Sequence, residues 1–355
     1  MLGLSVYLSE PIENQREYIL QLYERGFQSI FTSLHIPEDN PSVYKERLLE
    51  LGSIAKSKGM ELIADISPKS MDYLGYTWDS AHELLNWGLT GLRVDYGISE
   101  KDIVDLSKKM KVALNASTLT KESLARLKSL DLNIDSVEAW HNYYPRPETG
   151  LDRLEFREKN QWLKLEGIKT MAFIPGDGKL RGPLYKGLPT LEEHRYQTPF
   201  SAFLDLKENE NMDKILVGDF ELSEKSLEQF QSYCNDGYLL LRANANTSDE
   251  KILHSLESVH TNRWDSARDC IRSMESREYG LIGTESLEPF NTIKRELGSI
   301  TIDNVNYGRY KGEIQITKRS LHADEKVNVI GKIISEDLVL LPFMKGGTKF
   351  KILWQ

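Results

Sequence analysis

Short apolar runs alternate with longer amphipathic segments along the first two thirds of the chain. Eight runs have the length and content of buried strands, at residues 3–8, 29–34, 61–66, 91–96, 111–117, 136–141, 169–175 and 214–219. Between them lie helix-patterned segments such as 15–25 and 43–58. In the second of these, Val43, Leu48 and Ile54 are close to helical spacing, with charged residues on the other face. The pattern predicts repeated β–α units.

Glycines mark the ends of several of these helical segments. Gly26, Gly59, Gly88 and Gly167 each stand just before a predicted strand, where a glycine commonly ends a helix. Eight β–α units within about 230 residues match the number and size of a (β/α)₈ barrel. An open doubly wound sheet is the rival, but it usually has a Gly-rich first turn, and residues 8–11 (Leu-Ser-Glu-Pro) are not one. We therefore predict an α/β fold with a TIM barrel over residues 1–235.

The pattern of apolar and charged residues changes in the last third of the 355-residue chain. A charged segment at residues 248–275 is mostly helical in pattern. Short apolar runs with intervening turn signals then predict strands at residues 299–303, 312–317, 326–334, 338–341 and 349–353. Residues 236–355 are therefore expected to form a smaller β-rich domain. Because no low-complexity linker precedes it, we expect the two domains to pack together.

Charge and cysteine content exclude several classes of protein. The 45 Lys and Arg residues are outnumbered by 54 Asp and Glu residues, for a net charge of -9, which argues against a general nucleic-acid binder. Cys234 and Cys270 are too few for a disulfide scaffold, and neither is part of a CxxC pair. No apolar stretch is long enough to cross a membrane, and the first residues lack the basic start of a signal peptide. The expected location is the cytoplasm.

Polar residues stand at the carboxyl ends of the predicted strands, where TIM barrels build their active sites. Asp65 and Asp95 follow the third and fourth strands, which lie about 4.8 Å apart as neighbours in a parallel sheet. Glycosidases use such a carboxylate pair, one as acid and one as base or nucleophile. We take Asp65, Asp95 and Glu148 as catalytic candidates, without ordering their roles. Arg93, on the same strand as Asp95, is a candidate ion-pair partner that keeps Asp95 ionised.

Further strand-end residues are candidates for binding a polar substrate. Arg146, Lys179, Arg181, His194 and Arg195 form a cationic group in an otherwise acidic chain, suited to a phosphate or a carboxylate. Trp140, Tyr143 and Tyr144 are candidates for stacking on a sugar. The predicted substrate-binding residues within the barrel are Asn115, His141, Asn142, Tyr143, Arg146, Asp177, Arg181, His194 and Asp219.

Other catalytic chemistries have weaker support. The chain has no GxSxG elbow, no Walker loop and no HExxH helix. A metal site would have to join His141 with Asp65 or Asp95, and a Schiff base would have to use Lys69, which lies past the strand end. We therefore expect neither a metal nor a cofactor.

Three blocks carry a resemblance to a known family: residues 141–150 (His-Asn-Tyr-Tyr-Pro-Arg-Pro-Glu-Thr-Gly), 181–195 and 301–312. They resemble the signatures of a bacterial family associated with 6-phospho-N-acetylmuramidases, and the similarity extends over essentially the whole chain. The resemblance implies a TIM barrel followed by a cyclophilin-like β domain. It also implies a cytoplasmic hydrolase that cleaves MurNAc-6-phosphate-GlcNAc after uptake by a phosphotransferase system, in peptidoglycan recycling.

That substrate carries a 6-phosphate and a lactyl carboxylate, two anionic groups that the predicted arginines would bind. In the second domain, we expect the loop 307–310 to close over the barrel mouth, with Arg309 binding substrate. Two alternatives stay open at this stage: a sugar-phosphate isomerase, epimerase or lyase on the same barrel, and a non-catalytic phosphosugar-binding regulator. Nothing in the sequence predicts the oligomeric state.

Overall fold

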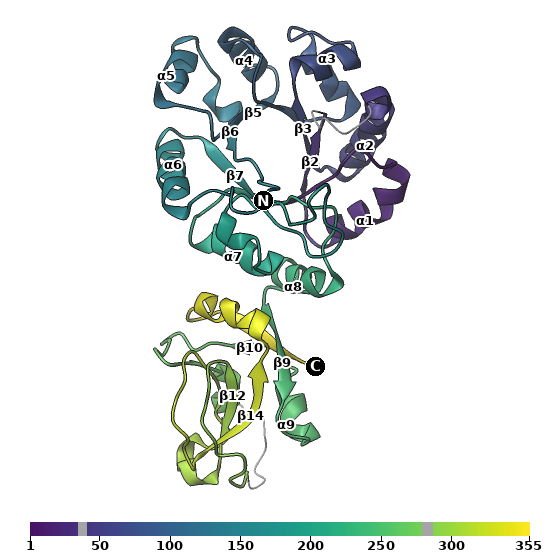
Figure 1. Cartoon of the computed structure of the whole chain (residues 1–355). Helices are drawn as coiled ribbons and strands as arrows, with labels where there is room; N and C mark the ends of the chain where they lie inside the picture. The colour runs from purple at the N-terminus through teal and green to yellow at the C-terminus, as the bar shows by residue number, and fades with distance from the viewer. Residues whose placement is uncertain (35–40, 279–286) are drawn as a thin grey trace. The chain divides into compact units, whose positions relative to one another are not determined.

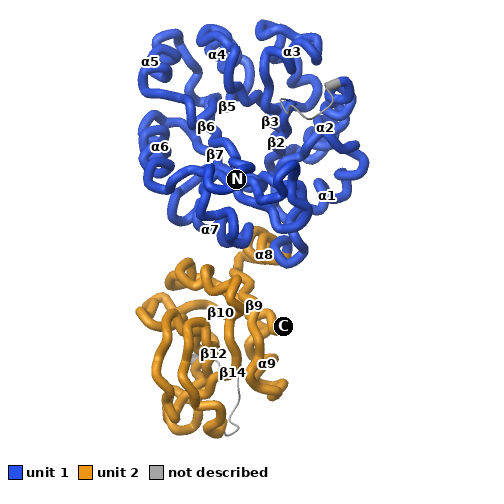
Figure 2. Tube along the Cα trace, in the orientation of Figure 1, with its two compact units in different colours: residues 1–227 blue, residues 228–355 orange. Residues whose placement is uncertain are grey.

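The computed structural model describes residues 1–34, 41–278 and 287–355. Within them the chain forms two compact units, residues 1–227 and 228–355 (Figure 2). Each unit has its own sheet, so each is described by itself.

The first unit is a closed barrel of eight parallel strands paired in sequence order, β1 to β8, with β8 returning to β1. The strands are β1 Leu2–Ser5, β2 Ser29–Ser33, β3 Glu61–Ile66, β4 Gly91–Val94, β5 Lys111–Asn115, β6 Val137–Trp140, β7 Lys169–Ile174 and β8 Lys214–Val217. Each falls within one residue of a predicted run or inside it. The predicted TIM barrel is confirmed.

Helices form the outer ring around the strands (Figure 1). They are α1 Ile12–Glu24, α2 Tyr44–Lys58, α3 Pro68–Leu74, α4 Glu100–Ser107, α5 Lys121–Ser129, α6 Arg153–Leu165 and α7 Pro199–Glu208. The next helix, α8 Glu224–Cys234, begins in this unit and ends in the second. Four short 3₁₀ segments add to the connections: η1 Pro41–Val43, η2 Ala81–Trp87, η3 Ile134–Ser136 and η4 Glu192–His194. The helix ends follow the sequence signals: Ser67 caps α3, Thr120 caps α5, and α2 ends at Gly59 in the left-handed conformation.

The barrel interior is filled by side chains in layers. The middle layer is apolar and consists of Phe31, Ile63, Ala113, Trp140, Met171, Phe173 and Leu216. Trp140 is fully buried there, with its ring 6.0 Å from that of Phe31. This corrects the expectation that Trp140 stacks on a sugar. The apolar layer separates two polar groups of residues, one at each end of the barrel.

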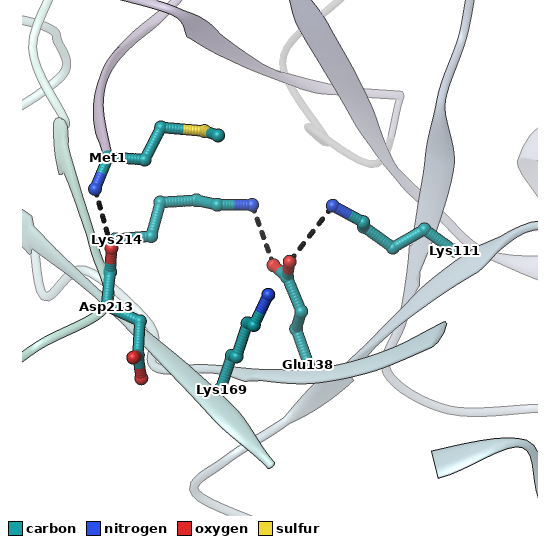
Figure 3. Close-up of a pocket in the computed structure, with 6 residues that line it drawn as sticks. All are labelled: Met1, Lys111, Glu138, Lys169, Asp213 and Lys214. Atoms are coloured by element: carbon teal, nitrogen blue, oxygen red, sulfur yellow. Dashed lines mark hydrogen bonds and ion pairs between the residues drawn. The ribbon is translucent and has the colours of Figure 1, made fainter. Parts of the chain in front are cut away.

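At the amino ends of the strands, two lysines and two glutamates form a buried ionic network. Lys214 Nζ lies 2.5 Å from Glu61 Oε2 and 2.7 Å from Glu138 Oε2, and Lys111 pairs with both glutamates as well. Burial opposes the ionisation of Glu61, but the two lysines outweigh it and hold the pKa of Glu61 at about 2. Lys214 and Lys111 both reach Glu138 (Figure 3). The three side chains line a cavity of about 240 Å³. Polar residues at this end of a TIM barrel usually serve stability rather than catalysis.

Removal of Lys214 from this network should destabilise the barrel strongly. In Lys214→Met, Glu61 and Glu138 would stay buried with only Lys111 to compensate them, and we expect a loss of about 3 kcal/mol. Lys169 lines the same cavity but is exposed, so Lys169→Met should change stability by no more than about 0.5 kcal/mol. Urea unfolding of the two variants measures the difference. Equal stabilities would contradict a structural role for the network.

The second unit is a mixed seven-stranded sheet in the order β10-β15-β9-β14-β12-β13-β11. Its strands are β9 Leu239–Ala245, β10 His260–Thr261, β11 Cys270–Arg272, β12 Ser299–Asp303, β13 Ile314–Thr317, β14 Val327–Ile333 and β15 Lys349–Trp354. Its short helices are α9 Glu250–Ser255, α10 Met274–Glu278, η5 Val305–Tyr310 and η6 Ser335–Phe343. Among the described strands of this unit, β9 and β15 pair in parallel and the other neighbours pair antiparallel. That the sheet is cyclophilin-like stays a prediction.

Two expectations for this unit were wrong. The apolar run 338–341 is not a strand but part of the 3₁₀ segment η6. The segment is held by Asp337, which is fully buried and accepts hydrogen bonds from the backbone and guanidinium of Arg242, and Pro342 has no N–H to give to a strand ladder. The charged segment 248–275 is helical only in α9 and in its last two residues, where α10 begins, because the buried Asn262 binds the carbonyls of Met344 and Lys345 and residues 270–272 join the sheet as β11.

Asp303, at the end of β12, gives this unit a distinct pH dependence. Burial, with the neighbouring charges of Glu313 and Asp324, raises the pKa of Asp303 to about 7, against a smaller opposing effect of Arg295. The folded state therefore holds a proton that the unfolded chain releases near pH 4, and stability falls as the pH rises from about 4 to 7. Asp303→Asn removes this loss.

We expect Asp303→Asn to gain roughly 2 kcal/mol over the wild type between pH 5 and pH 8, from 1.36 kcal/mol per pKa unit. Thermal unfolding at a series of pH values measures it. The matched control is Asp269→Asn, since Asp269 is paired with Arg268 at the surface and its pKa is lowered rather than raised. A stability gain independent of pH would contradict this account of Asp303.

Candidate active site

The second polar group lies at the carboxyl ends of the barrel strands, above the apolar layer. Arg93 of β4 crosses the interior: its Nη1 donates to Asp65 Oδ1 of β3 at 2.8 Å, and its Nη2 donates to Asn142 Oδ1, after β6, at 2.5 Å. Ser33 of β2 donates to the other oxygen of Asp65 at 3.4 Å. Because side chains from four strands meet here, these residues point into the barrel.

Arg93 and Asp65 form a nearly buried ion pair, with side chains 5% and 15% exposed. A buried guanidinium beside a carboxylate stabilises its charged form. The sequence placed Arg93 next to Asp95, but the strand register pairs it with Asp65. The acid that forms an ion pair with Arg93 is therefore Asp65.

Asp95 lies nearer to solvent than Asp65. Because Arg93 is level with Asp65, Asp95 is two residues further towards the mouth, about 6–7 Å along the strand direction. Asp95 is exposed, and its Oδ1 accepts a hydrogen bond from Asn115 Nδ2 at 2.7 Å. The two acids thus occupy different depths, rather than the same level that was expected from neighbouring strand ends. Asn115 is fixed in turn because its Oδ1 accepts from the Ser117 amide.

Arg181 is held against two tyrosines. Its guanidinium lies 4.5 Å from the ring centre of Tyr7 and 5.7 Å from that of Tyr143, and its Nη1 donates to Tyr143 Oη at 2.9 Å. Tyr7 is fully buried and donates to the carbonyl of Gly218. Burial raises the pKa of both phenols, so both remain protonated at neutral pH. The stack fixes the position of a cation at the mouth, as a cation–π contact does.

Tyr7 was missed as a candidate residue in the sequence. The available signal was its place two residues past β1, at the same end of the barrel as the other candidates. The apolar run 3–8 placed Tyr7 inside the predicted first strand, whereas β1 ends two residues earlier, at Ser5.

Two of the predicted acids support backbone instead. Asp219 is buried and accepts the amide N–H groups of Gly176, Arg181 and Leu188 at 2.8–3.0 Å, and burial raises its pKa. Asp177 accepts hydrogen bonds from Ser223 and Ser226 at the start of α8. These contacts explain why polar residues follow β7 and β8 without facing the mouth.

Both predicted histidines are buried outside the barrel interior. His141 packs on Phe156 of α6, and its Nε2 lies 2.8 Å from Asn160 Oδ1, so burial lowers its pKa to about 4. His194 is fully buried and lies 2.7 Å from Asp205 of α7. Successive strand residues alternate in direction, which sends His141 out and Asn142 in. Neither ring reaches the mouth.

The remaining candidates are exposed or lie in the other unit. Arg146 and Glu148 are exposed on the loop after β6, and Lys179 pairs with Glu10 at 2.5 Å. Arg309 belongs to the second unit, where it donates to Tyr310 Oη at 2.9 Å, and its contact with substrate stays a prediction. Across residues 1–34, 41–278 and 287–355, no three His, Cys, Asp or Glu side chains are grouped to hold a metal ion.

Comparison with known proteins adds a family assignment. A family model described as 6-phospho-N-acetylmuramidase, N-terminal, matches residues 2–232, and one described as 6-phospho-N-acetylmuramidase, C-terminal, matches residues 239–353. No curated protein matches the sequence. In the described part of the chain, no helix is both long and apolar enough to cross a membrane.

Two solved structures are similar over their full length. A conserved protein of unknown function from Enterococcus faecalis has 42% identity and a TM-score of 0.91, with 100% of this chain and 96% of that chain covered. An uncharacterised Bacillus cereus protein has 27% identity and a TM-score of 0.76, with 99% of each chain covered. Both similarities extend over the barrel and the second unit.

Proposed function

The chain belongs to the 6-phospho-N-acetylmuramidase family, and on that premise we propose that it hydrolyses MurNAc-6-phosphate-GlcNAc to MurNAc-6-phosphate and GlcNAc. The reaction would be a cytoplasmic step of peptidoglycan recycling, because the family resemblance implies a disaccharide phosphorylated during uptake. The observation that supports this most is the Asp65–Arg93 ion pair at the end of the barrel where active sites form.

Asp65 is the proposed base or nucleophile. Glycoside hydrolysis needs a carboxylate that attacks the sugar or activates water, and Asp65 is the acid that Arg93 holds in a fixed position in the barrel mouth. Asn142 and Ser33 complete the fixed surroundings of the pair. Both carboxylate oxygens of Asp65 accept hydrogen bonds, so the carboxylate has a fixed position in the barrel mouth, as catalysis by positioning requires.

Asp95 is the proposed proton donor to the leaving oxygen. It lies nearer to the entrance than Asp65, on the side from which a disaccharide would extend towards solvent. Asn115 orients it through the hydrogen bond to Oδ1, which leaves Oδ2 to carry the proton. Glu148 is the reserve candidate, and its exposed position on the β6–α6 loop makes it the weaker one.

Arg181 is the proposed ligand of the 6-phosphate. A guanidinium suits a phosphate because its planar N–H groups match two phosphate oxygens. Tyr7 and Tyr143 hold the group in place, and Tyr143 is also near enough to Asp65 for that carboxylate to contribute to its raised pKa, after the larger effect of burial. This would let one sugar contact the phosphate ligand and the catalytic pair at once.

Product analysis in H₂¹⁸O tests the reaction type. Hydrolysis breaks the bond between C1 of MurNAc-6-phosphate and O4 of GlcNAc, and water adds its oxygen to C1 and its proton to O4. We expect one ¹⁸O per MurNAc-6-phosphate and none in GlcNAc by mass spectrometry of early samples. A lyase would release an unlabelled, dehydrated sugar phosphate, an isomerase would release no GlcNAc, and a binding protein would leave the disaccharide intact.

A further inference from the structure

Arg195 lies buried between the two longest loops of the barrel mouth. Its side chain is 0% exposed, although it carries a charge and sits just past η4. Its Nε and Nη2 donate to Glu192 Oε1 and Oε2, each at 2.6 Å. This two-point contact fixes the plane of the guanidinium.

The same guanidinium donates to backbone carbonyls of both loops. On the β7–α7 loop it reaches Lys186 O at 3.3 Å and Gly187 O at 3.1 Å. On the β6–α6 loop it reaches Tyr144 O at 2.9 Å and Arg146 O at 3.3 Å. One side chain thus links two segments about forty residues apart in the sequence.

Glu192 extends the link to the far end of the β6–α6 loop. Its two oxygens accept the amide N–H groups of Glu148 at 2.8 Å and Gly150 at 2.7 Å. The hydrogen bonds from Arg195 are the main reason that the pKa of Glu192 is lowered to about 2, so the pair stays ionised at any working pH. Gly150 also sits so close to Glu192 that a Cβ there would lie 2.6 Å from its Oε2.

The two linked loops carry the residues assigned to the phosphate site. Tyr143 begins the β6–α6 loop, and Arg181 lies in the β7–α7 loop. Backbone bonds from Tyr144 N to Pro189 O and from Leu151 N to Thr190 O, both 2.9 Å, run between the same loops. Any shift of one loop against the other would change the separation of Tyr143 and Arg181.

We propose that Arg195 and Glu192 form a positioning clamp that sets the distance between Tyr143 and Arg181, and with it the selection of a phosphorylated sugar. The phosphate part of this inference rests on the proposed function, whereas the coupling of the two loops does not. Arg195 does not itself bind substrate, because its donors are taken by Glu192 and the four carbonyls. This replaces the earlier expectation that Arg195 belongs to the anion-binding group.

The variant that tests the clamp is Arg195→Lys. Lysine keeps the charge but has a single donor centre, which cannot hold Glu192 and carbonyls of two loops together. The matched control is Arg242→Lys, because Arg242 also holds a buried carboxylate, that of Asp337, with two N–H groups, but in the second unit rather than in the two loops. Equal losses of thermal stability in the two variants would show that the fold is similarly affected.

Hydrogen exchange measures the coupling without any reference to activity. In Arg195→Lys we expect at least tenfold faster exchange in peptides covering residues 144–151 and 185–190 together, and no such change in Arg242→Lys. Unchanged exchange, or faster exchange in one loop alone, would overturn the clamp. If the exchange result holds but the wild type releases no GlcNAc, the proposed function fails while the coupling stands.

Kinetics then separate positioning from general support. For Arg195→Lys we expect kcat/KM on MurNAc-6-phosphate-GlcNAc to fall about 10²-fold, mainly through KM, because small displacements of binding groups have effects of this size. The unphosphorylated disaccharide should lose much less, so the preference for phosphate shrinks. An equal fall for both substrates, as expected for Arg242→Lys if it loses activity at all, would contradict a role in phosphate selection.

Discussion

Asp65→Asn is expected to lower kcat for GlcNAc release by about 10³-fold or more, the size of effect seen when an essential base or nucleophile is removed. The amide cannot attack C1 or take a proton from water, and it is neutral, so it also leaves the buried guanidinium of Arg93 without its counter-charge. KM should change little, because the lost interaction is made chiefly in the transition state.

The control for this loss is a second Asp→Asn change that keeps the local hydrogen bonds. Asp152 caps α6 by accepting the amides of Leu154 and Glu155, and asparagine caps helices equally well. Asp152→Asn should therefore retain nearly full turnover. A rate for Asp65→Asn within tenfold of the wild type would remove Asp65 from the reaction, and the pair of Asp95 and Glu148 would have to replace it.

Arg181→Met should abolish most of the preference for a phosphorylated substrate. Two charge-assisted hydrogen bonds to a phosphate contribute about 1.5–3 kcal/mol each, so kcat/KM for MurNAc-6-phosphate-GlcNAc should fall by about 10²–10⁴-fold. Methionine fills similar space over the rings of Tyr7 and Tyr143, which limits the effect on packing. The unphosphorylated disaccharide should be cleaved at nearly its former rate.

Lys179→Met is the matched control, because Lys179 lies two residues away, pairs with Glu10 and packs over Phe220. It removes a positive charge from the same loop without touching the tyrosine stack. If Arg181→Met and Lys179→Met reduced phosphate preference equally, the effect would come from the overall charge of the loop. If Arg181→Met slowed both substrates alike, Arg181 would not be the phosphate ligand.

The barrel was predictable because its signals are local and repeated. Apolar runs such as 61–66 and 214–219 could only be buried strands, and glycines such as Gly59 marked the helix ends. The run 338–341 was wrongly predicted to be a strand, because its conformation depends on the contact of Asp337 with Arg242, almost a hundred residues earlier. Such a tertiary contact leaves no periodic trace in the sequence.

The candidate site was predictable in its location but not in its pairings. Strand ends pointed to Asp65, Asp95 and Arg181, yet the partner of Arg93 depends on the register between β3 and β4, which sequence does not state. Whether the side chain of His141 points into the barrel or outward depends on a shift of one residue, because successive strand residues alternate in direction. Arg195 was predicted to belong to the anion-binding group, because its four carbonyl acceptors are backbone atoms, which no residue type in the sequence reveals.

The most direct test of the proposed function compares two substrates with the purified full chain. GlcNAc release is measured from MurNAc-6-phosphate-GlcNAc and from the same disaccharide without phosphate, at substrate concentrations far below KM. The proposal predicts rapid release from the first and a kcat/KM at least about 10²-fold lower for the second, from the phosphate contacts of Arg181. No release from either substrate would contradict the glycosidase assignment, and equal release would contradict the phosphate site.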